Sequence, residues 1–262
     1  MFFGNRFIEP DYDFETKGFW VDNQKFKTYS EYNYLSSNTV VSKIRRYHFE
    51  KVLQLTEEYF NKASVIDFGC ADGSFLPTLS KYFPNVLGID IDPNYIDICT
   101  KLIDKMNLDN CKCICSENMS IEELKSKING SFNLLFLLEV LEHIGEKDNM
   151  YESKMDFLRQ ISSLIPDDGL IVISVPNMVG LGFLIQRFGL SILGLYREEL
   201  TWKELLYAGF LNKTDELEQK WRFESHIGFN HKKLEQYMKK EFQIVEKSNI
   251  FFQTVYVIKK FI

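Results

Sequence analysis

The sequence predicts an α/β fold, a Rossmann-like doubly wound sheet of seven strands. From Ala63 onward, short apolar runs alternate with turn signals and with amphipathic stretches of about ten or more residues, the pattern of α/β proteins. The apolar runs are continuous, as in parallel strands that are buried on both faces. The amphipathic stretches are long enough for the crossover helices that parallel pairing requires.

Each expected element is bounded by a turn signal, and the chain divides into four regions. We expect strands at 64–68, 85–90, 111–115, 132–138, 169–175, 242–248 and 251–260, and helices at 74–82, 94–106, 120–127, 150–164 and 231–240. Residues 1–60 are expected to form a helical leader, 61–177 the ligand-binding core, 178–230 an insertion, and 231–262 a last helix with two strands. The insertion is predicted to be a lid over the carboxyl ends of the strands, where such sheets bind ligands.

Composition and charge exclude several classes of protein. The 31 Lys and Arg residues against 37 Asp and Glu residues leave a net charge of −6, opposite to the basic field of a nucleic-acid binder. The first ten residues lack a basic and an apolar signal region, so we expect a cytoplasmic protein. The apolar segment 179–196 is broken by Gln186, Arg187 and glycines, which argues against stable membrane insertion.

The five cysteines are expected to be reduced thiols rather than a disulfide framework. Cys111, Cys113 and Cys115 are the only group close together in the sequence. On a strand, residues two apart lie about 7 Å from each other, too far to share one zinc ion. No metal is therefore predicted there.

A loop of small residues follows the first strand of the core. Gly69, Ala71 and Gly73 allow a ligand to approach the backbone where the strand turns into a helix. A dinucleotide fingerprint would need glycine where Ser74 stands, which disfavours NAD. Asp90, at the end of the second strand, is placed to accept both hydroxyls of a ribose. The sequence therefore predicts a nucleoside site.

Five segments closely resemble the motifs of class I S-adenosylmethionine-dependent methyltransferases, in the order of that family. They are VIDFGCADGSF, VLGIDID, ICSENM, FNLLFLLEVLEHI and LRQISSLIPDDGLIVISVPN, between Ala63 and Asn177. The resemblance implies S-adenosylmethionine as cofactor, S-adenosylhomocysteine as product, and a contact set from the strand ends. In it, Asp67 orients the methionine ammonium, Gly69, Cys70, Ala71 and Gly73 surround the methionine tail, Asp90 holds the ribose, Ile91 packs on the adenine, Glu117 or Asn118 meets its amino edge, and the Leu138 carbonyl accepts from the ammonium.

Two of the four histidines are candidates for catalysis. His143 follows the fourth strand in the segment EVLEH, which resembles Glu-His pairs beside the acceptor in coenzyme Q-type O-methyltransferases, and it would act as a base or position the acceptor. His226 precedes the last helix, where relatives bring an acceptor-facing loop over the site. Glu139, Glu142 and His143 offer a weaker alternative, a magnesium-type site, which three ligands alone do not establish.

The function that follows is S-adenosylmethionine-dependent O-methylation of a small molecule. The favoured acceptor is a nucleotide-linked or phosphorylated sugar of bacterial capsular or O-antigen polysaccharide synthesis. A quinone-precursor phenol, a phosphate or phosphoramidate capsule modification, and a non-catalytic S-adenosylmethionine-binding protein remain alternatives. The acceptor atom and the oligomeric state are left open, because fold does not determine substrate.

Overall fold

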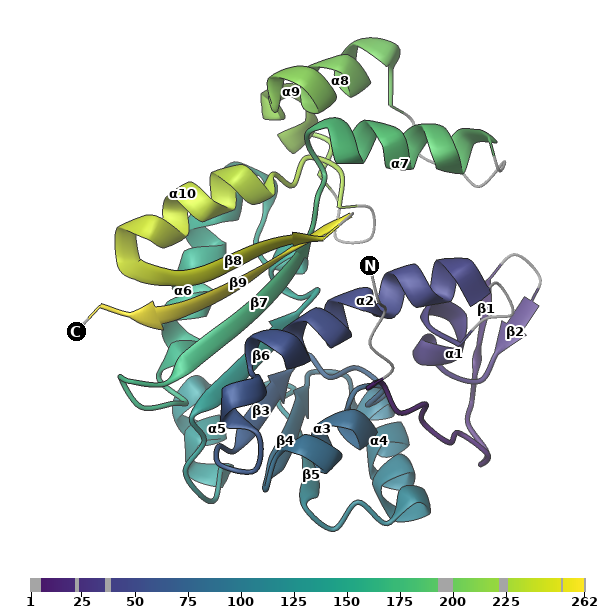
Figure 1. Ribbon diagram of the computed structural model, residues 1–262, viewed down its shortest axis with the longest axis vertical. Coiled ribbons are helices and arrows are strands. Elements are labelled where there is room, and N and C mark those ends of the chain that lie inside the picture. Colours follow the sequence, from purple (N-terminus) through teal and green to yellow (C-terminus); the bar gives the residue numbers. More distant parts are fainter. Residues whose placement is uncertain are drawn as a thin grey trace. The chain divides into compact units, whose positions relative to one another are not determined.

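The computed structural model describes residues 6–21, 24–35, 39–192, 200–221, 226–250 and 252–261. The chain falls into two compact units. The first comprises residues 1–138 and 164–172, and the second comprises residues 139–163 and 173–262. Figure 1 labels the helices and strands and colours them along the sequence.

The strands of the core form one mixed seven-stranded sheet, in the order β5-β4-β3-β6-β7-β9-β8. The pairs β3–β4, β3–β6 and β4–β5 are parallel, whereas β8 and β9 run antiparallel. The predicted Rossmann-like fold is thereby confirmed. The strands are β3 (Val65–Phe68), β4 (Val86–Asp90), β5 (Cys111–Cys115), β6 (Leu134–Leu138), β7 (Leu170–Pro176), β8 (Phe242–Ile250) and β9 (Gln253–Lys260).

The first unit carries the strands that were expected from continuous apolar runs. Every residue of β3, β4 and β6 is buried, as parallel strands covered on both faces require. The crossover helices are α3 (Leu76–Tyr82), α4 (Pro93–Met106) and α5 (Ile121–Lys127). Asp92 caps α4, since its carboxylate accepts a hydrogen bond from the Asn94 amide and Pro93 occupies the first turn.

The leader differs from the helical segment that the sequence predicts, because it begins with a small antiparallel hairpin. The rings of Phe19, Phe26 and Tyr32 pack together there, with Phe26 and Tyr32 centroids 5.0 Å apart. Strands of three residues are too short for a period-two pattern to stand out in a sequence. The leader elements are β1 (Phe19–Val21), β2 (Gln24–Phe26), α1 (Tyr29–Asn33), α2 (Thr39–Leu55) and the 3-10 helix η1 (Glu57–Tyr59).

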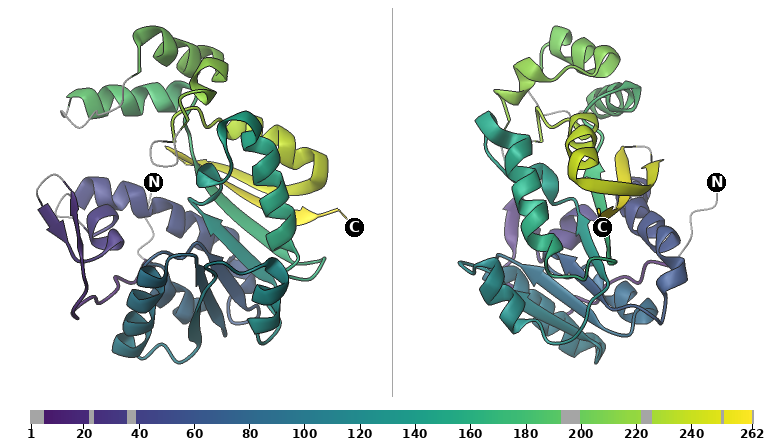
Figure 2. Two further views of the ribbon diagram at one scale, coloured as in Figure 1. Left: turned by 180° about the vertical axis from the view of Figure 1, so that it is seen from behind. Right: turned by 90° about the vertical axis from the view of Figure 1, so that its left-hand side faces the viewer.

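The second unit contains the remaining helices and the β8–β9 hairpin. Helix α10 lies beside α6 (Figure 2). The rings of Tyr151 and Tyr237 stack between these helices at 5.4 Å. The elements are η2 (Leu141–His143), η3 (Lys147–Asn149), α6 (Met150–Ser162), α7 (Leu181–Ile192), α8 (Trp202–Leu206), the π-helical turn η4 (Tyr207–Leu211), α9 (Asp215–Glu218) and α10 (His231–Glu241).

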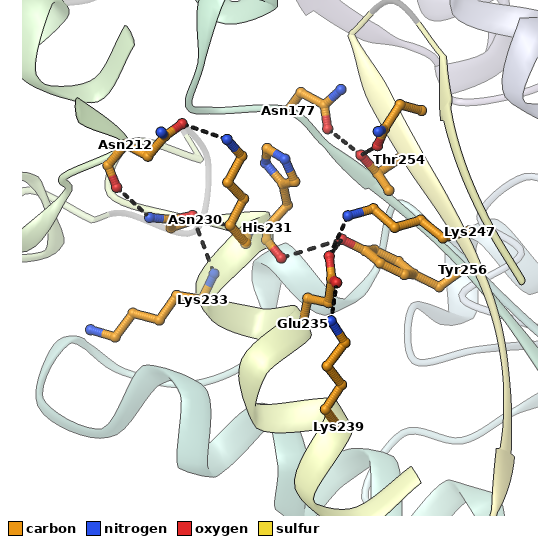
Figure 3. Close-up of polar contacts among 12 residues, drawn as sticks. Asn177, Asn212, Asn230, His231, Lys233, Glu235, Lys239, Lys247, Thr254 and Tyr256 are labelled. Atoms are coloured by element: carbon orange, nitrogen blue, oxygen red, sulfur yellow. Dashed lines mark hydrogen bonds and ion pairs between the residues drawn. The ribbon is translucent and has the colours of Figure 1, made fainter. Parts of the chain in front are cut away.

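Polar side chains connect α10 to the insertion before it and to the β8–β9 hairpin after it. Asn230 caps the helix by accepting from two backbone amides, and its own amide group donates to the Asn212 carbonyl. Glu235 accepts from Lys239 and Lys247, and the Tyr256 hydroxyl on β9 donates to it (Figure 3). These contacts fix the start of α10, immediately after the segment that contains the second candidate histidine.

The described part of the insertion 178–230 consists of short helices joined by turns and irregular segments. Residues 193–199 and 222–225 lie outside the described part, so its role as a lid stays a prediction. On α7, Phe183 and Leu184 are buried, while Leu181 and Ile185 are exposed. Within the described ranges, no helix combines the length and the apolar character that crossing a bilayer would need.

We expect Asp92→Ala to lower the free energy of unfolding by about 1 kcal/mol, because it removes the side-chain cap of α4. The Asp92 amide, which donates to Asp90, is a backbone group and remains. Urea denaturation measures the change. An unaltered unfolding midpoint would show that the cap does not contribute to stability.

Candidate active site

The loop between β3 and α3 has a strained backbone that hydrogen bonds hold in place. Gly69, Ala71 and Gly73 all have positive φ angles, of 82°, 47° and 83°. For Ala71 this conformation costs about 1–2 kcal/mol, because its Cβ approaches the following carbonyl. The Ala71 amide donates to a carboxylate oxygen of Asp90 at 2.8 Å, which stabilises the turn.

Asp90 joins the loop to the end of β4. One oxygen accepts from the Ala71 amide, and the other accepts from the Asp92 amide at 3.0 Å. A carboxylate offers about four acceptor positions, so two remain for the hydroxyls of a ribose. Asp90, the residue predicted to bind the ribose, therefore also holds the loop that is predicted to surround the cofactor tail.

Asp67, near the end of β3, is a buried carboxyl group, and desolvation and negative charges dominate its surroundings among the described residues. Burial raises its pKa to about 7, and the charges of Cys113 and Asp90 act in the same direction. A positively charged ligand group would reverse this shift, because an opposite charge favours the ionised carboxylate. The ammonium of S-adenosylmethionine has the required charge, so this position fits the cofactor.

Asp72 connects the leader to the same loop, and sequence reasoning missed it. Its carboxylate accepts from the Ser30 amide at 2.7 Å, from the Ser30 hydroxyl, and from the Tyr12 hydroxyl at 3.2 Å. The partners lie 42 and 60 residues away in the sequence, so no local pattern could indicate the contact. The leader thus takes part in holding the cofactor loop.

The remaining predicted cofactor residues lie at neighbouring strand ends of the first unit. Asp90 pairs with Cys115 in the register of β4 and β5, which brings Ile91 level with the turn that contains Glu117 and Asn118. Ile91 is 64% exposed, and both turn residues are exposed as well, as a group that contacts a ligand must be before it binds. Leu138 ends β6 and is buried. Their contacts with the cofactor stay predictions.

The two candidate histidines meet in the second unit. The Nε2 atoms of His143 and His226 lie 3.2 Å apart, with the rings nearly perpendicular at 70°. His143 ends the 3-10 helix η2, and His226 has a positive φ of 55° shortly before α10. Burial lowers the pKa of His226 to about 3, and the charges of His143, Arg187 and Lys154 add to this effect.

Glu142 completes this cluster with a buried carboxylate. It is fully buried, and neither oxygen has a hydrogen-bond partner among the described residues. Burial raises its pKa well above the ordinary value, and the charge of Glu139 contributes. Lys154 is close, but its ammonium donates to the backbone carbonyls of Glu142 and Ile144 rather than to the carboxylate.

The cluster has the composition of a divalent-cation site, with a different membership from the one considered in the sequence. Donor atoms of Glu142, His143 and His226 all lie within 4.8 Å of one another. Two nitrogens 3.2 Å apart can share an ion at the usual bond length of about 2.0–2.1 Å. Glu139 does not belong to the group, because its carboxylate accepts from the Ser174 hydroxyl at 2.9 Å. His226, 83 residues beyond His143 in the chain, takes its place.

Affinity for S-adenosylhomocysteine should depend on pH through Asp67. An ammonium group binds the ionised carboxylate better, and with a pKa of about 7 the ionised fraction falls as the pH drops from 8 to 6. We expect about tenfold weaker binding at pH 6 in calorimetric titration. Asp67→Asn should bind weakly at both pH values. An equal pH dependence in that variant would assign the titration to another group.

Asp90→Ala should weaken S-adenosylhomocysteine binding by about tenfold or more, because hydrogen bonds to a charged group contribute about 1.5–3 kcal/mol. The variant also removes the acceptor of the Ala71 amide. Asp92→Ala is the matched control, since it changes a nearby carboxylate whose role is to cap α4. Calorimetry would contradict the assignment of Asp90 if both variants bound like the unchanged protein.

Comparison with known proteins supports this interpretation of the fold. Residues 40–240 match a family model described as a methyltransferase domain. Human EEF1A lysine methyltransferase 2 is 27% identical over 121 residues, 44% of this chain and 48% of that protein. A ubiquinone biosynthesis O-methyltransferase of Xanthomonas campestris is 24% identical over 127 residues, 48% of each chain. The chain thus matches about half the length of these curated relatives.

The structure is also similar to that of N-methyltransferase NodS from Bradyrhizobium japonicum WM9 in complex with S-adenosylhomocysteine. The TM-score is 0.53 at 12% sequence identity, and the match covers 86% of this chain and 90% of that one. The family model covers more than half of the chain, and its agreement with the fold confirms the resemblance that the motifs indicated. The chain belongs to the methyltransferase-domain family, with the class I fold of S-adenosylmethionine-dependent methyltransferases.

Proposed function

We propose that this protein transfers the methyl group of S-adenosylmethionine to an oxygen atom of a small molecule. The observation that supports oxygen as the acceptor atom is the cluster of Glu142, His143 and His226. Its donor set suits a divalent cation, whose chemistry when bound is to lower the pKa of a hydroxyl group at its side. Methylation of a hydroxyl needs that help, because a neutral hydroxyl is a poor nucleophile.

The residues of the cluster have different roles in holding the acceptor. His226, with a pKa of about 3, is neutral throughout the physiological range and offers a nitrogen lone pair. Such a weak base suits a cation ligand better than a proton acceptor, because a general base works best with a pKa near the working pH. Glu142 would supply negative charge once a bound cation offsets the burial that raises its pKa, and the Lys154 ammonium donates to the Glu142 backbone carbonyl on η2.

Methyl transfer depends on the positioning of the two reactants and needs no covalent intermediate with the enzyme. The reaction is an in-line displacement at the sulfonium methyl group, so cofactor and acceptor must be held close together with the proper orientation. The loop locked by Asp90 and Asp72 would hold the cofactor, and the Glu142 cluster would hold the acceptor hydroxyl. His143 is our candidate for the residue that positions the acceptor hydroxyl, since its Nε2 atom lies 3.2 Å from that of His226 in this cluster.

Within this activity, we favour a nucleotide-linked or phosphorylated sugar, as in bacterial capsule or O-antigen synthesis. Arg187 on α7 is buried, and its charge acts on the neighbouring His226. A buried guanidinium near the cluster favours an anionic acceptor, because arginine recognises phosphate groups well. A quinone-precursor phenol is the second candidate, favoured by the name of the Xanthomonas relative and by the exposed apolar side chains of α7.

The release of S-adenosylhomocysteine tests these proposals on a panel of nucleotide sugars, sugar phosphates and catechol-type phenols, with magnesium or with a chelator. We expect turnover with a phosphorylated or nucleotide-linked sugar, and its loss with the chelator. Turnover of a phenol alone would replace the sugar assignment. Cofactor binding without turnover on any acceptor would favour a non-catalytic S-adenosylmethionine-binding protein.

His143→Ala, His226→Ala and Glu142→Gln should each lower kcat by about a hundredfold or more, because each removes a donor from the acceptor cluster. Their affinity for S-adenosylhomocysteine should stay unchanged. His231→Gln is the control, since this buried histidine lies outside the cluster. Equal loss of activity in the control would point to a folding defect, and full activity in the three variants would remove the cluster from the reaction.

A further inference from the structure

Three cysteines that are far apart in the sequence converge behind the cofactor loop. Cys70 lies in the loop, Cys99 on α4 and Cys113 on β5, and their sulfur atoms all lie within 4.8 Å of one another. The Sγ atoms of Cys70 and Cys99 are 3.9 Å apart. In the sequence, Cys113 is grouped instead with Cys111 and Cys115, but residues two apart on a strand lie about 7 Å from each other, and only Cys113 belongs to this cluster.

We propose that Cys70, Cys99 and Cys113 form a binding site for one soft, thiolate-preferring metal ion behind the cofactor loop. Zinc–sulfur bonds are about 2.3 Å long, so sulfurs that share an ion lie roughly 4 Å apart. The Cys70–Cys99 separation of 3.9 Å has this value. Thiolates select soft ions such as Cu(I) and Zn(II) over magnesium and calcium. The site is separate from the histidine cluster and does not depend on the proposed methyl transfer.

Two glycines approach the sulfurs so closely that a side chain at either position would crowd the cluster. A Cβ atom at Gly88 on β4 would lie 3.0 Å from the sulfurs of both Cys113 and Cys70. A Cβ atom at Gly73 would lie 2.9 Å from the Cys99 sulfur. Two glycines therefore border the cluster, one on each side, and the Cys99 sulfur also approaches the Ala71 carbonyl oxygen at 3.1 Å.

The three thiols also interact with one another. Hydrogen bonds from Cys70 and Cys99 lower the pKa of Cys113 to about 5. The pKa values of Cys70 and Cys99 are raised by the neighbouring thiols and by burial. A divalent ion held by all three sulfurs would bind them as thiolates, so the protons that the thiols carry would be released and the complex would have a single net negative charge.

An ion in this site would tie the cofactor loop to two further elements. It would link Cys70 to α4 and β5, next to Ala71, whose amide is held by Asp90. Because the ion would fix this loop, ion binding would change the affinity for the cofactor. By linkage, cofactor binding would change the affinity for the ion by the same factor.

Cadmium is a suitable probe, because sulfur-to-cadmium charge transfer absorbs in the ultraviolet and reports thiolate ligands only, even if the histidine cluster also takes up metal. Titration of the full chain should give this band with one ion per chain, together with proton release. Zinc should compete with cadmium and remove the band. Cys113→Ser and Cys99→Ser should weaken cadmium binding by about tenfold or more.

Cys111→Ser and Cys115→Ser are matched controls on β5, and both should keep the band. Gly88→Ala is a second kind of variant: it retains all three thiols but places a methyl group against two of them, and should weaken binding as well. S-adenosylhomocysteine binding checks that each variant is folded. The proposal is overturned if the band is absent, if it survives in the Cys99 and Cys113 variants, or if it is lost in the Cys111 or Cys115 variant.

Discussion

The hydrogen bond between the Ala71 amide and the Asp90 carboxylate is the contact on which the cofactor site depends. It joins the loop after β3 to the end of β4 and holds a non-glycine residue at a positive φ angle. Such strain persists only where surrounding contacts over-determine the backbone. Asp72 lies in the loop itself and accepts a hydrogen bond from the Ser30 amide of the leader. Two carboxylates therefore fix this short loop, one through the end of β4 and the other through the leader.

Both compact units contain a buried carboxyl group that a cation would stabilise. Asp67 in the first unit and Glu142 in the second have raised pKa values, chiefly because burial disfavours the charged form. Perturbed carboxyl groups of this kind concentrate at functional sites. The ligands differ in chemistry: the ammonium of a cofactor suits Asp67, whereas Glu142 lies with two imidazole nitrogens and suits a metal ion.

Much of the fold could be predicted because its determinants are local. Continuous apolar runs identified the strands β3 to β7 within one or two residues, and the Asp92-Pro93 pair marked the start of α4. The β1–β2 hairpin could not be predicted, since its strands are short and its stability comes from aromatic contacts with the following helix. In the site, the sequence predicted the positions of Asp67 and Asp90 at strand ends, whereas the contact of Asp72 with the leader could not be predicted.

The sequence alone determined the family and the residues that follow the carboxyl ends of the strands, because parallel strands end at one edge of the sheet and the residues after each strand can be identified from the sequence. Only the tertiary structure decided which distant side chains meet. His226 joins Glu142 and His143 in place of Glu139, and Cys70 and Cys99 join Cys113 in place of Cys111 and Cys115. The reason is physical: the direction of a side chain depends on the pleat of its strand and the turn of its loop, and contacts across 29 to 83 residues leave no trace in local spacing.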